Sequence, residues 1–274
     1  MNSTTTTDEN SPWKVSEFVE IILIFMYFLI TFIALSGNGI VCYLVLAYKR
    51  MHTVPNYFIF NLAVSDILVA IFCIPFSFVA NLKNYWPFGV AMCPIVMYSQ
   101  VVTVFLSSYT LVAMSIDRYV VIVHPFLRRI TTRQTVFVIL AIWVISLAIP
   151  LPTLLHSQIL YFSNTSGQCL EIWESDLEKS RYSLALMILH YFAPLAILIF
   201  SYSKIGYNIW IKNFRNDEGN KRRLQLAAAK QKVSMLSLII FVIFSLCMIL
   251  MYLCCNWITL QFILIQIGLI FAKS

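Results

Sequence analysis

The chain has 274 residues, of which 60% are hydrophobic and only 11% are charged, and its formal net charge is +7. Soluble globular domains carry about 25% charged residues. This composition therefore excludes an ordinary soluble domain and indicates a protein that lies in a lipid bilayer.

Apolar stretches follow a polar start, residues 1–17, which we expect to form an extracellular tail. Six stretches are long enough to cross a bilayer as helices: residues 21–48, 57–82, 90–122, 135–155, 183–211 and 233–255. A seventh, residues 257–272, has about 16 residues and is marginal for a crossing. The predicted fold class is all-α: a multi-pass transmembrane helical bundle over residues 18–274, with six clear spans and a doubtful, truncated seventh.

Basic residues collect in the loops that follow spans one, three and five. Because lysine and arginine are retained on the cytoplasmic side, these loops are predicted inside and the N-terminus outside. The opposite side is acidic and includes Glu171 and Glu174. Two N-glycosylation sequons, at Asn2 and Asn164, also fall on this outer side, which agrees with the charge rule.

Two of the seven cysteines lie outside the apolar interior of the spans. Cys93 opens span three on the outer side, and Cys169 lies in the outer loop before span five. An oxidising compartment allows them to pair, and the bridge would tie that loop across the mouth of the bundle. Spacing alone does not prove the pairing. The five cysteines inside spans are interpreted as small packing residues.

Charged and polar side chains inside spans predict function because burying them in lipid is costly. Asp117 and Arg118 close span three; the alternative is an interfacial pair that extends to the headgroups. Asp66 lies in the middle of span two, with Asn38 and Ser107 at comparable depth. A carboxylate with neutral oxygen neighbours suits a sodium ion or a proton. The alternative is a protonated, structural Asp66.

Prolines interrupt three spans, at Pro75, Pro150 with Pro152, and Pro194. Each frees a backbone carbonyl, and we expect kinks there that open a cavity toward the outside. Trp143 in span four is interpreted as a packing residue.

Separated residues along the first five spans together resemble rhodopsin-like G-protein-coupled receptors, a seven-helix class. They are Asn38, the segment 61–66, Cys93, Asp117-Arg118-Tyr119, Trp143, Cys169, Pro194 and Tyr202. A narrower set is similar to neuropeptide receptors of the neuropeptide Y, neuropeptide F and luqin/RYamide group, nearest to the RYamide branch. It comprises the segments 73–76, 85–89, 109–113 and 115–119.

The resemblance implies an amidated neuropeptide ligand that ends in Arg-Phe or Arg-Tyr and binds on the extracellular side. The acidic outer face, with Glu171 and Glu174, would attract its arginine. Gln100 matches the position that hydrogen-bonds the terminal amide in this group. The alternative is a polar residue satisfied by another helix.

The resemblance also implies a two-state switch at the plasma membrane. Arg118 would pair with Asp117 in the inactive state and swing toward Tyr202 and a heterotrimeric G protein on activation. Besides the bilayer, a receptor dimer is a further partner, and no nucleic acid is expected. An enzyme is not expected either, because the four histidines show no metal-ligand spacing, and sodium near Asp66 is the only ion or cofactor predicted.

The last part of the chain departs from the resemblance. Met248 and Leu250 stand where the family carries the tryptophan and proline of span six, and no Asn-Pro-x-x-Tyr follows. The abrupt stop after Ser274 suggests a C-terminally incomplete receptor. Two functions are therefore predicted: a peptide-activated receptor or, alternatively, a truncated non-signalling isoform that pairs with and modulates the full-length receptor.

Overall fold

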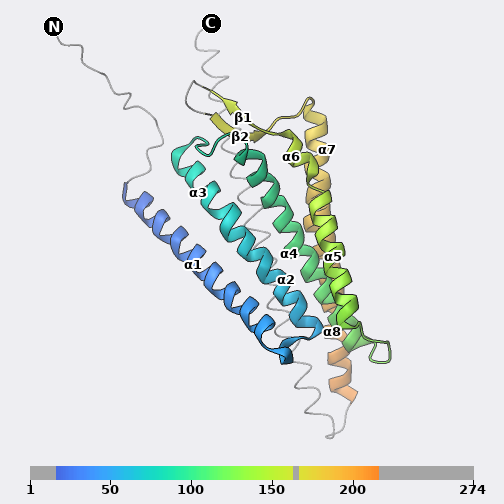
Figure 1. Cartoon of the computed structure of the whole chain (residues 1–274). Helices are drawn as coiled ribbons and strands as arrows, with labels where there is room; N and C mark the ends of the chain where they lie inside the picture. Colours follow the sequence, from blue (N-terminus) through green and yellow to red (C-terminus); the bar gives the residue numbers. More distant parts are fainter. Residues whose placement is uncertain (1–16, 163–166, 216–274) are drawn as a thin grey trace, which may run out of the picture. The chain divides into compact units, whose positions relative to one another are not determined.

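The computed structural model describes residues 17–162 and 167–215 (Figure 1). Within these residues, five helices are long and apolar enough to cross a membrane: Ile24–Ala47, Val54–Lys83, Met92–Val123, Thr132–His156 and Asp176–Asn208. They confirm the first five predicted spans and the helical fold class. The N-terminal tail, span six, the seventh stretch and both sequons lie outside the described residues.

The elements follow one another with short connections. In chain order they are α1 (Glu17–Ala47), η1 (Lys49–Met51), α2 (Val54–Leu68), η2 (Val69–Cys73), α3 (Ile74–Lys83), α4 (Met92–Val123), α5 (Thr132–Ala148), α6 (Leu151–His156), β1 (Ser157–Tyr161), β2 (Gly167–Glu171), α7 (Asp176–Met187), η3 (Ile188–Phe192) and α8 (Ala193–Arg215). The elements η2 and η3 are single π-helical turns.

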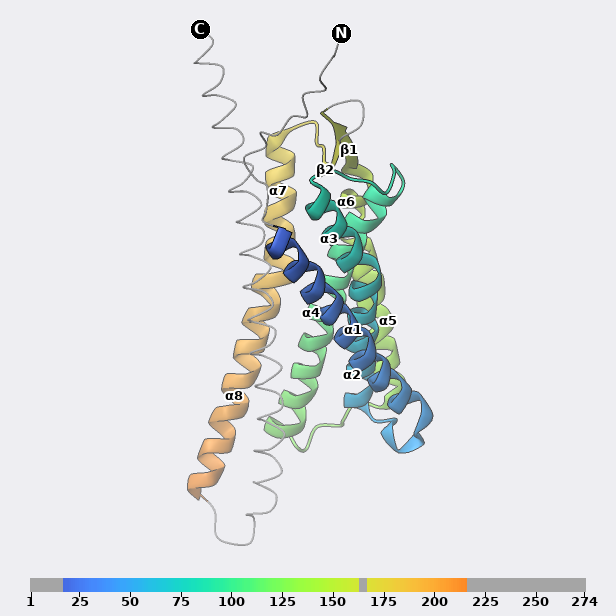
Figure 2. The ribbon, with the colours of Figure 1, turned by 90° about the vertical axis from the view of Figure 1, so that its left-hand side faces the viewer.

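The described residues divide into two compact units. Unit 1 comprises residues 17–51, 63–103, 146–162 and 167–172, and unit 2 comprises residues 52–62, 104–145 and 173–215. In unit 1, α1 contacts α3 and η2, and β1 pairs with β2. In unit 2, α7 continues through η3 into α8, a path that Figure 2 shows from end to end.

Each π-helical turn precedes a proline by the same offset. η2 ends at Cys73, two residues before Pro75, and η3 ends at Phe192, two residues before Pro194. Proline has no N–H and its ring clashes with the carbonyl four residues earlier, so the preceding turn widens and bonds five residues back instead. The N–H of Ile74 accordingly donates to Val69, and that of Ala193 donates to Ile188. Pro75 and Pro194 thus each follow a wide turn, whereas the predicted kinks and outward cavity stay predictions.

Burial is concentrated in α4. Half of the 18-residue apolar stretch of this helix is buried, against 6% in α1, which presents exposed large apolar side chains such as Phe28 and Phe32. In water such a surface would be unfavourable, but lipid tails cover it without penalty. Hydroxyl groups buried along α4 bond carbonyls of their own helix, as Thr110 does with Leu106 and Ser115 with Val112. The helix thus satisfies polar groups internally, as a bilayer requires.

Two features differ from the sequence prediction. Residues expected as outer loop form the antiparallel hairpin β1–β2, in which Ile159 pairs with Cys169. The fifth span begins at Asp176 rather than near residue 183, because Ser175 caps it by accepting a hydrogen bond from the Leu177 N–H, and two acids lie in its first turn. Capping of this kind extends a helix beyond its apolar part.

Candidate functional site

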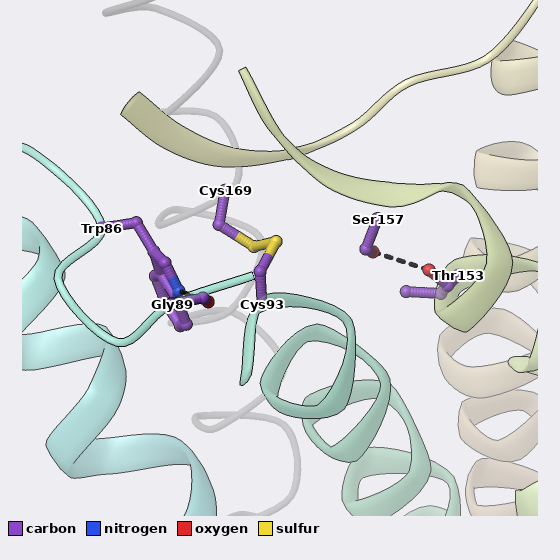
Figure 3. The surroundings of a disulfide bond; sticks show 6 residues. All are labelled: Trp86, Gly89, Cys93, Thr153, Ser157 and Cys169. Carbon is purple, nitrogen blue, oxygen red and sulfur yellow. Dashed lines mark hydrogen bonds between the residues drawn. A yellow bond between two sulfur atoms is a disulfide. The ribbon is translucent and has the colours of Figure 1, made fainter. Parts of the chain in front are cut away.

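A disulfide fixes the β1–β2 hairpin to the first turn of α4. Cys93 in α4 forms a disulfide with Cys169 in β2, 76 residues further along the chain (Figure 3). This confirms the pairing that an oxidising compartment was expected to allow. Cys93 is completely buried. The bridge holds the hairpin at what we call the Cys93 end of α4.

The loop between α3 and α4 forms a second attachment for the hairpin. The Trp86 N–H donates to the Gly167 carbonyl over 2.8 Å, and the Trp86 indole donates to the Gly89 carbonyl over 2.9 Å. Phe88 packs edge-on against both Trp86 and Phe76. Gly167 has no room for a side chain, because a Cβ there would lie 2.7 Å from Ile159. The hairpin is therefore held at two points of β2, Gly167 and Cys169.

Gln100 lies two turns into α4 from Cys93 and is half-buried. Its amide nitrogen donates to the hydroxyl of Ser77 in α3 over 2.5 Å. In this amide orientation the carbonyl oxygen takes no part in the bond, so it can serve as an acceptor. Gln100 is therefore also bonded to another helix, which is what the alternative interpretation of this residue expected.

The two predicted acids lie on either side of the junction between the units. Glu171 ends β2 and is half-buried, and Glu174 is exposed before α7. The strand pairing continues past Glu171, since the Ile172 N–H donates to the His156 carbonyl. Strand pairing therefore fixes the backbone at Glu171, whereas Glu174 lies beyond the paired strands, in the segment before α7.

The Asp117-Arg118-Tyr119 sequence lies near the last turn of α4. Tyr119 packs against a buried cluster that contains Leu198, Tyr202 and Ile205 of α8. Its ring also contacts Phe200 and meets His124 edge-on. Two of the predicted switch residues, Tyr119 and Tyr202, are therefore brought together.

The predicted pairing of Arg118 with Asp117 stays a prediction. The hydrogen bonds and ion pairs found among residues 17–162 and 167–215 do not include it.

Trp143 is more than the predicted packing residue. Its indole N–H donates to the Asn61 side-chain oxygen over 2.8 Å, and the Asn61 amide donates to Thr110 over 2.8 Å. Asn61 is only 4% exposed. One amide thereby joins α2, α4 and α5 within unit 2, and both of its polar ends are used.

The three proposed ion-site residues lie in two different units. Asp66 is half-buried in α2, and Asn38 is half-buried in α1, where its amide donates to the Ala34 carbonyl. Ser107 belongs to unit 2, so its distance from the other two is not determined. Within the described ranges, no group of three or more His, Cys, Asp or Glu side chains could hold a metal ion. Carboxylate, amide and hydroxyl oxygens are donors that suit a hard cation such as sodium.

Sequence reasoning missed a contact between α4 and the π-turn of unit 2. The Tyr109 hydroxyl donates to the Leu189 carbonyl over 3.2 Å, and Phe105 stacks on Tyr109 and packs against His190. The fully buried Pro194 follows this turn. The signal was present in the sequence, because an aromatic pair four residues apart lies on one helix face.

These features define a multi-pass helical membrane protein of the receptor type. It combines long apolar helices, a disulfide-anchored hairpin, and an acid–base pair near the other end of the helix that carries the disulfide.

The family model for the seven-transmembrane receptors of the rhodopsin family matches residues 37–266, and the chain belongs to this family. It is 40% identical over 239 residues to the RYamide receptor of Drosophila melanogaster, covering 85% of this chain and 52% of that protein. It is 37% identical to the RYamide receptor of Tribolium castaneum, covering 81% and 64%. It is 34% identical to neuropeptide FF receptor 2 of Rattus norvegicus, covering 82% and 56%.

The chain spans about half to two thirds of the length of these curated relatives. The comparisons confirm the predicted superfamily and agree with the predicted neuropeptide-receptor group. They also agree with the prediction that the chain is not an enzyme, since the family consists of receptors.

Proposed function

We propose that this chain is a receptor at the plasma membrane, with its N-terminus outside, that binds an amidated neuropeptide and activates a heterotrimeric G protein. The proposal is supported by its similarity to two RYamide receptors and a neuropeptide FF receptor. The charge distribution of the loops supports the orientation.

The observation that carries the ligand class is the hydrogen bond from Gln100 to Ser77. It leaves the carbonyl oxygen of Gln100 to accept from a ligand. A C-terminal carboxamide has N–H groups to donate, whereas a free carboxylate has none and would be repelled by an acceptor oxygen. Glu171, on the hairpin held by the disulfide, would add attraction for an arginine next to that amide.

The Arg118 end of α4 supplies the coupling surface. Tyr119 and Tyr202 share one buried cluster, so a shift of α8 against α4 would disturb the residue next to Arg118. Packed interfaces of this kind rearrange between discrete states rather than deforming smoothly. Ligand binding at the Cys93 end would act by favouring one of them.

Two further assignments complete the proposal. Sodium would bind near Asp66, with Asn38 and Ser107 as neutral oxygen donors. Asn2 and Asn164 would carry N-linked glycans on the outer side. A receptor dimer stays a prediction.

The proposal predicts peptide-stimulated nucleotide exchange on a heterotrimeric G protein by the chain in lipid nanodiscs. An amidated peptide ending in Arg-Tyr should stimulate exchange, and the same peptide with a free C-terminal acid should be about fivefold weaker or more, because losing the hydrogen bond to the half-buried Gln100 costs about 1–3 kcal/mol. Equal potency of amide and acid would contradict the amide readout. No exchange from a folded chain with any such peptide would contradict receptor signalling.

The proposal also predicts that the substitution Gln100→Leu weakens binding of the amidated peptide by about tenfold, because the acceptor for the peptide's terminal amide is lost. Leucine keeps the volume and leaves the helix intact. Peptide affinity is measured by fluorescence anisotropy with a labelled peptide.

Ser99→Ala is the matched control for Gln100→Leu. Ser99 precedes Gln100 in α4, and its hydroxyl donates to the Ile95 carbonyl of its own helix over 2.6 Å. Its removal should leave peptide affinity unchanged. A Gln100→Leu chain that binds the amide as tightly as Ser99→Ala would remove Gln100 from the ligand site.

A further inference from the structure

The fourth span is interrupted by two prolines, and this break changes which backbone groups are hydrogen-bonded. α5 ends at Ala148, and α6 begins at Leu151. Pro150 and Pro152 have no N–H, so neither can donate to the carbonyl four residues before it. The carbonyls of Ser146 and Ala148 therefore lose their usual helical partners. Within a bilayer, such groups are satisfied by other protein groups or by ordered water.

A side chain of another helix bonds one carbonyl at this break. The Tyr98 hydroxyl of α4 donates to the Leu147 carbonyl over 2.7 Å. This bond uses the hydroxyl hydrogen of Tyr98, and the hydroxyl oxygen can still accept a hydrogen bond. Tyr98 and residues 146–162 belong to the same unit. An acceptor oxygen of α4 therefore lies beside the residue that follows Ser146.

Ser146 places a hydroxyl at the break, and this residue is completely buried. Within residues 17–162 and 167–215, its hydroxyl oxygen is the one buried side-chain nitrogen or oxygen that has no hydrogen-bond partner. Burying a hydroxyl without a partner is unfavourable, and native proteins rarely leave such a group unsatisfied. We propose that the hydroxyl and the freed carbonyl of Ser146 bind an ordered water molecule.

The donor and acceptor groups at the break suit water. The water accepts from the Ser146 hydroxyl, and it donates to the Ser146 carbonyl and to the hydroxyl oxygen of Tyr98. A buried water typically makes about three hydrogen bonds of this kind. Because Ser146 and Pro150 are both fully buried, the site excludes a lipid headgroup or a larger ligand. α6 joins the break to β1, so the water stabilises the base from which the hairpin begins.

This hydration site is separate from the proposed ligand site. Tyr98 and Gln100 are two residues apart on α4, so their side chains point to nearly opposite sides of the helix. Gln100 bonds Ser77 of α3, whereas Tyr98 bonds Leu147 of α5. Binding of the water therefore does not depend on peptide binding or signalling.

The first test compares the thermal midpoint of unfolding of the full chain in lipid nanodiscs between the wild type and Ser146→Ala. The substitution removes one partner of the water and leaves the others, so we expect the midpoint to fall by about 2–4 °C. If no water binds, the substitution removes an unsatisfied buried hydroxyl and introduces a better helix former, so the midpoint rises or stays unchanged. Either of these two results overturns the inference.

Ser115→Ala is the matched control for Ser146→Ala. Ser115 is also completely buried, and its hydroxyl donates to the Val112 carbonyl of its own helix over 2.8 Å. This carbonyl belongs to a continuous helix, so the control should lower the midpoint by less than Ser146→Ala does. An equal fall in both variants would reflect the loss of any buried serine hydroxyl and would overturn the assignment of a water to Ser146.

The second test detects the water itself by radiolytic hydroxyl-radical labelling of the same chains, because a bound water yields radicals that modify the side chains beside it. We expect the wild type to be labelled at Tyr98, and this labelling to be several-fold lower in Ser146→Ala. Tyr109 is the reference, since its hydroxyl also donates to a backbone carbonyl, that of Leu189, and it should be labelled equally in both chains. Equal labelling of Tyr98 in both chains overturns the inference. Neither test uses peptide or G protein, so this inference and the proposed function fail separately.

Discussion

Replacing Cys93 and Cys169 together with serine is expected to lower the free energy of unfolding by about 2–5 kcal/mol. The bridge closes a loop that includes α4, α5, α6 and β1, and its loss frees that long segment in the unfolded chain. The fully buried position of Cys93 adds to the effect, because a serine hydroxyl there must find a new partner. The measurement is the thermal midpoint of unfolding in detergent, followed by intrinsic fluorescence.

Cys42→Ser provides the control for this change. Cys42 is a half-buried free cysteine in α1, so the substitution removes a thiol without removing a bridge, and its effect should be small. The double variant should also bind the amidated peptide more weakly, because Glu171 sits on the released strand. A double variant that unfolds at the wild-type midpoint would show that the Trp86 loop alone holds the hairpin.

Asn61→Leu is expected to destabilise the chain by about 2–3 kcal/mol. The substitution leaves the Trp143 indole N–H without its acceptor, and an unsatisfied buried donor costs about 1–3 kcal/mol. It also removes the bond to Thr110, although hydrogen bonds between membrane helices average only about 0.6 kcal/mol each. Thr110 is affected less than Trp143, because its hydroxyl keeps the hydrogen bond to the Leu106 carbonyl.

A double-mutant cycle with Trp143→Phe isolates the pair. If the indole is the main partner, Asn61→Leu should cost clearly less in the Trp143→Phe background. Asn208→Leu serves as the control, because Asn208 bonds only the Lys204 carbonyl of its own helix among the contacts found, and it should change the midpoint little. Additive effects of Asn61→Leu and Trp143→Phe would rule out the network as a source of stability.

The sequence predicted the spans well because bilayer thickness sets their length and lipid excludes charge from them. Residues 90–122 and the helix Met92–Val123 differ by no more than two residues at either end. The helix that contains the fifth span begins seven residues before the predicted apolar stretch, because hydropathy cannot register a capping serine such as Ser175. The hairpin was missed for a similar reason, since a short strand pair stabilised by a disulfide has no hydropathy signal.

Candidate site residues could be predicted where burying their side chain in lipid costs free energy. They were harder to predict where the role of the side chain depends on a bonding partner. Asp66 and Arg118 were selected by that cost, Cys93 with Cys169 by their outer position, and Gln100 by its match to a position in the neuropeptide-receptor group. Ser77 was overlooked, and Asn61 was noted only as part of the segment 61–66, because each bonds residues that are distant in sequence. No periodicity encodes such a bond, and only the packing of helices creates it.

The π-turn before Pro75 changes how positions along that span should be compared. A helix of 3.6 residues per turn would bring Asp66 and Ser77 to nearly the same azimuth, about three turns apart. The wide turn Val69–Cys73 takes up roughly one extra residue, so the two side chains diverge by about a quarter of a revolution. A relative without this turn would give misleading helical positions for the residues that follow it, because a helical wheel or residue count transferred from that relative would assign Ser77 to the wrong face. Positions on the face that contacts Gln100 should therefore be counted from Pro75 onward.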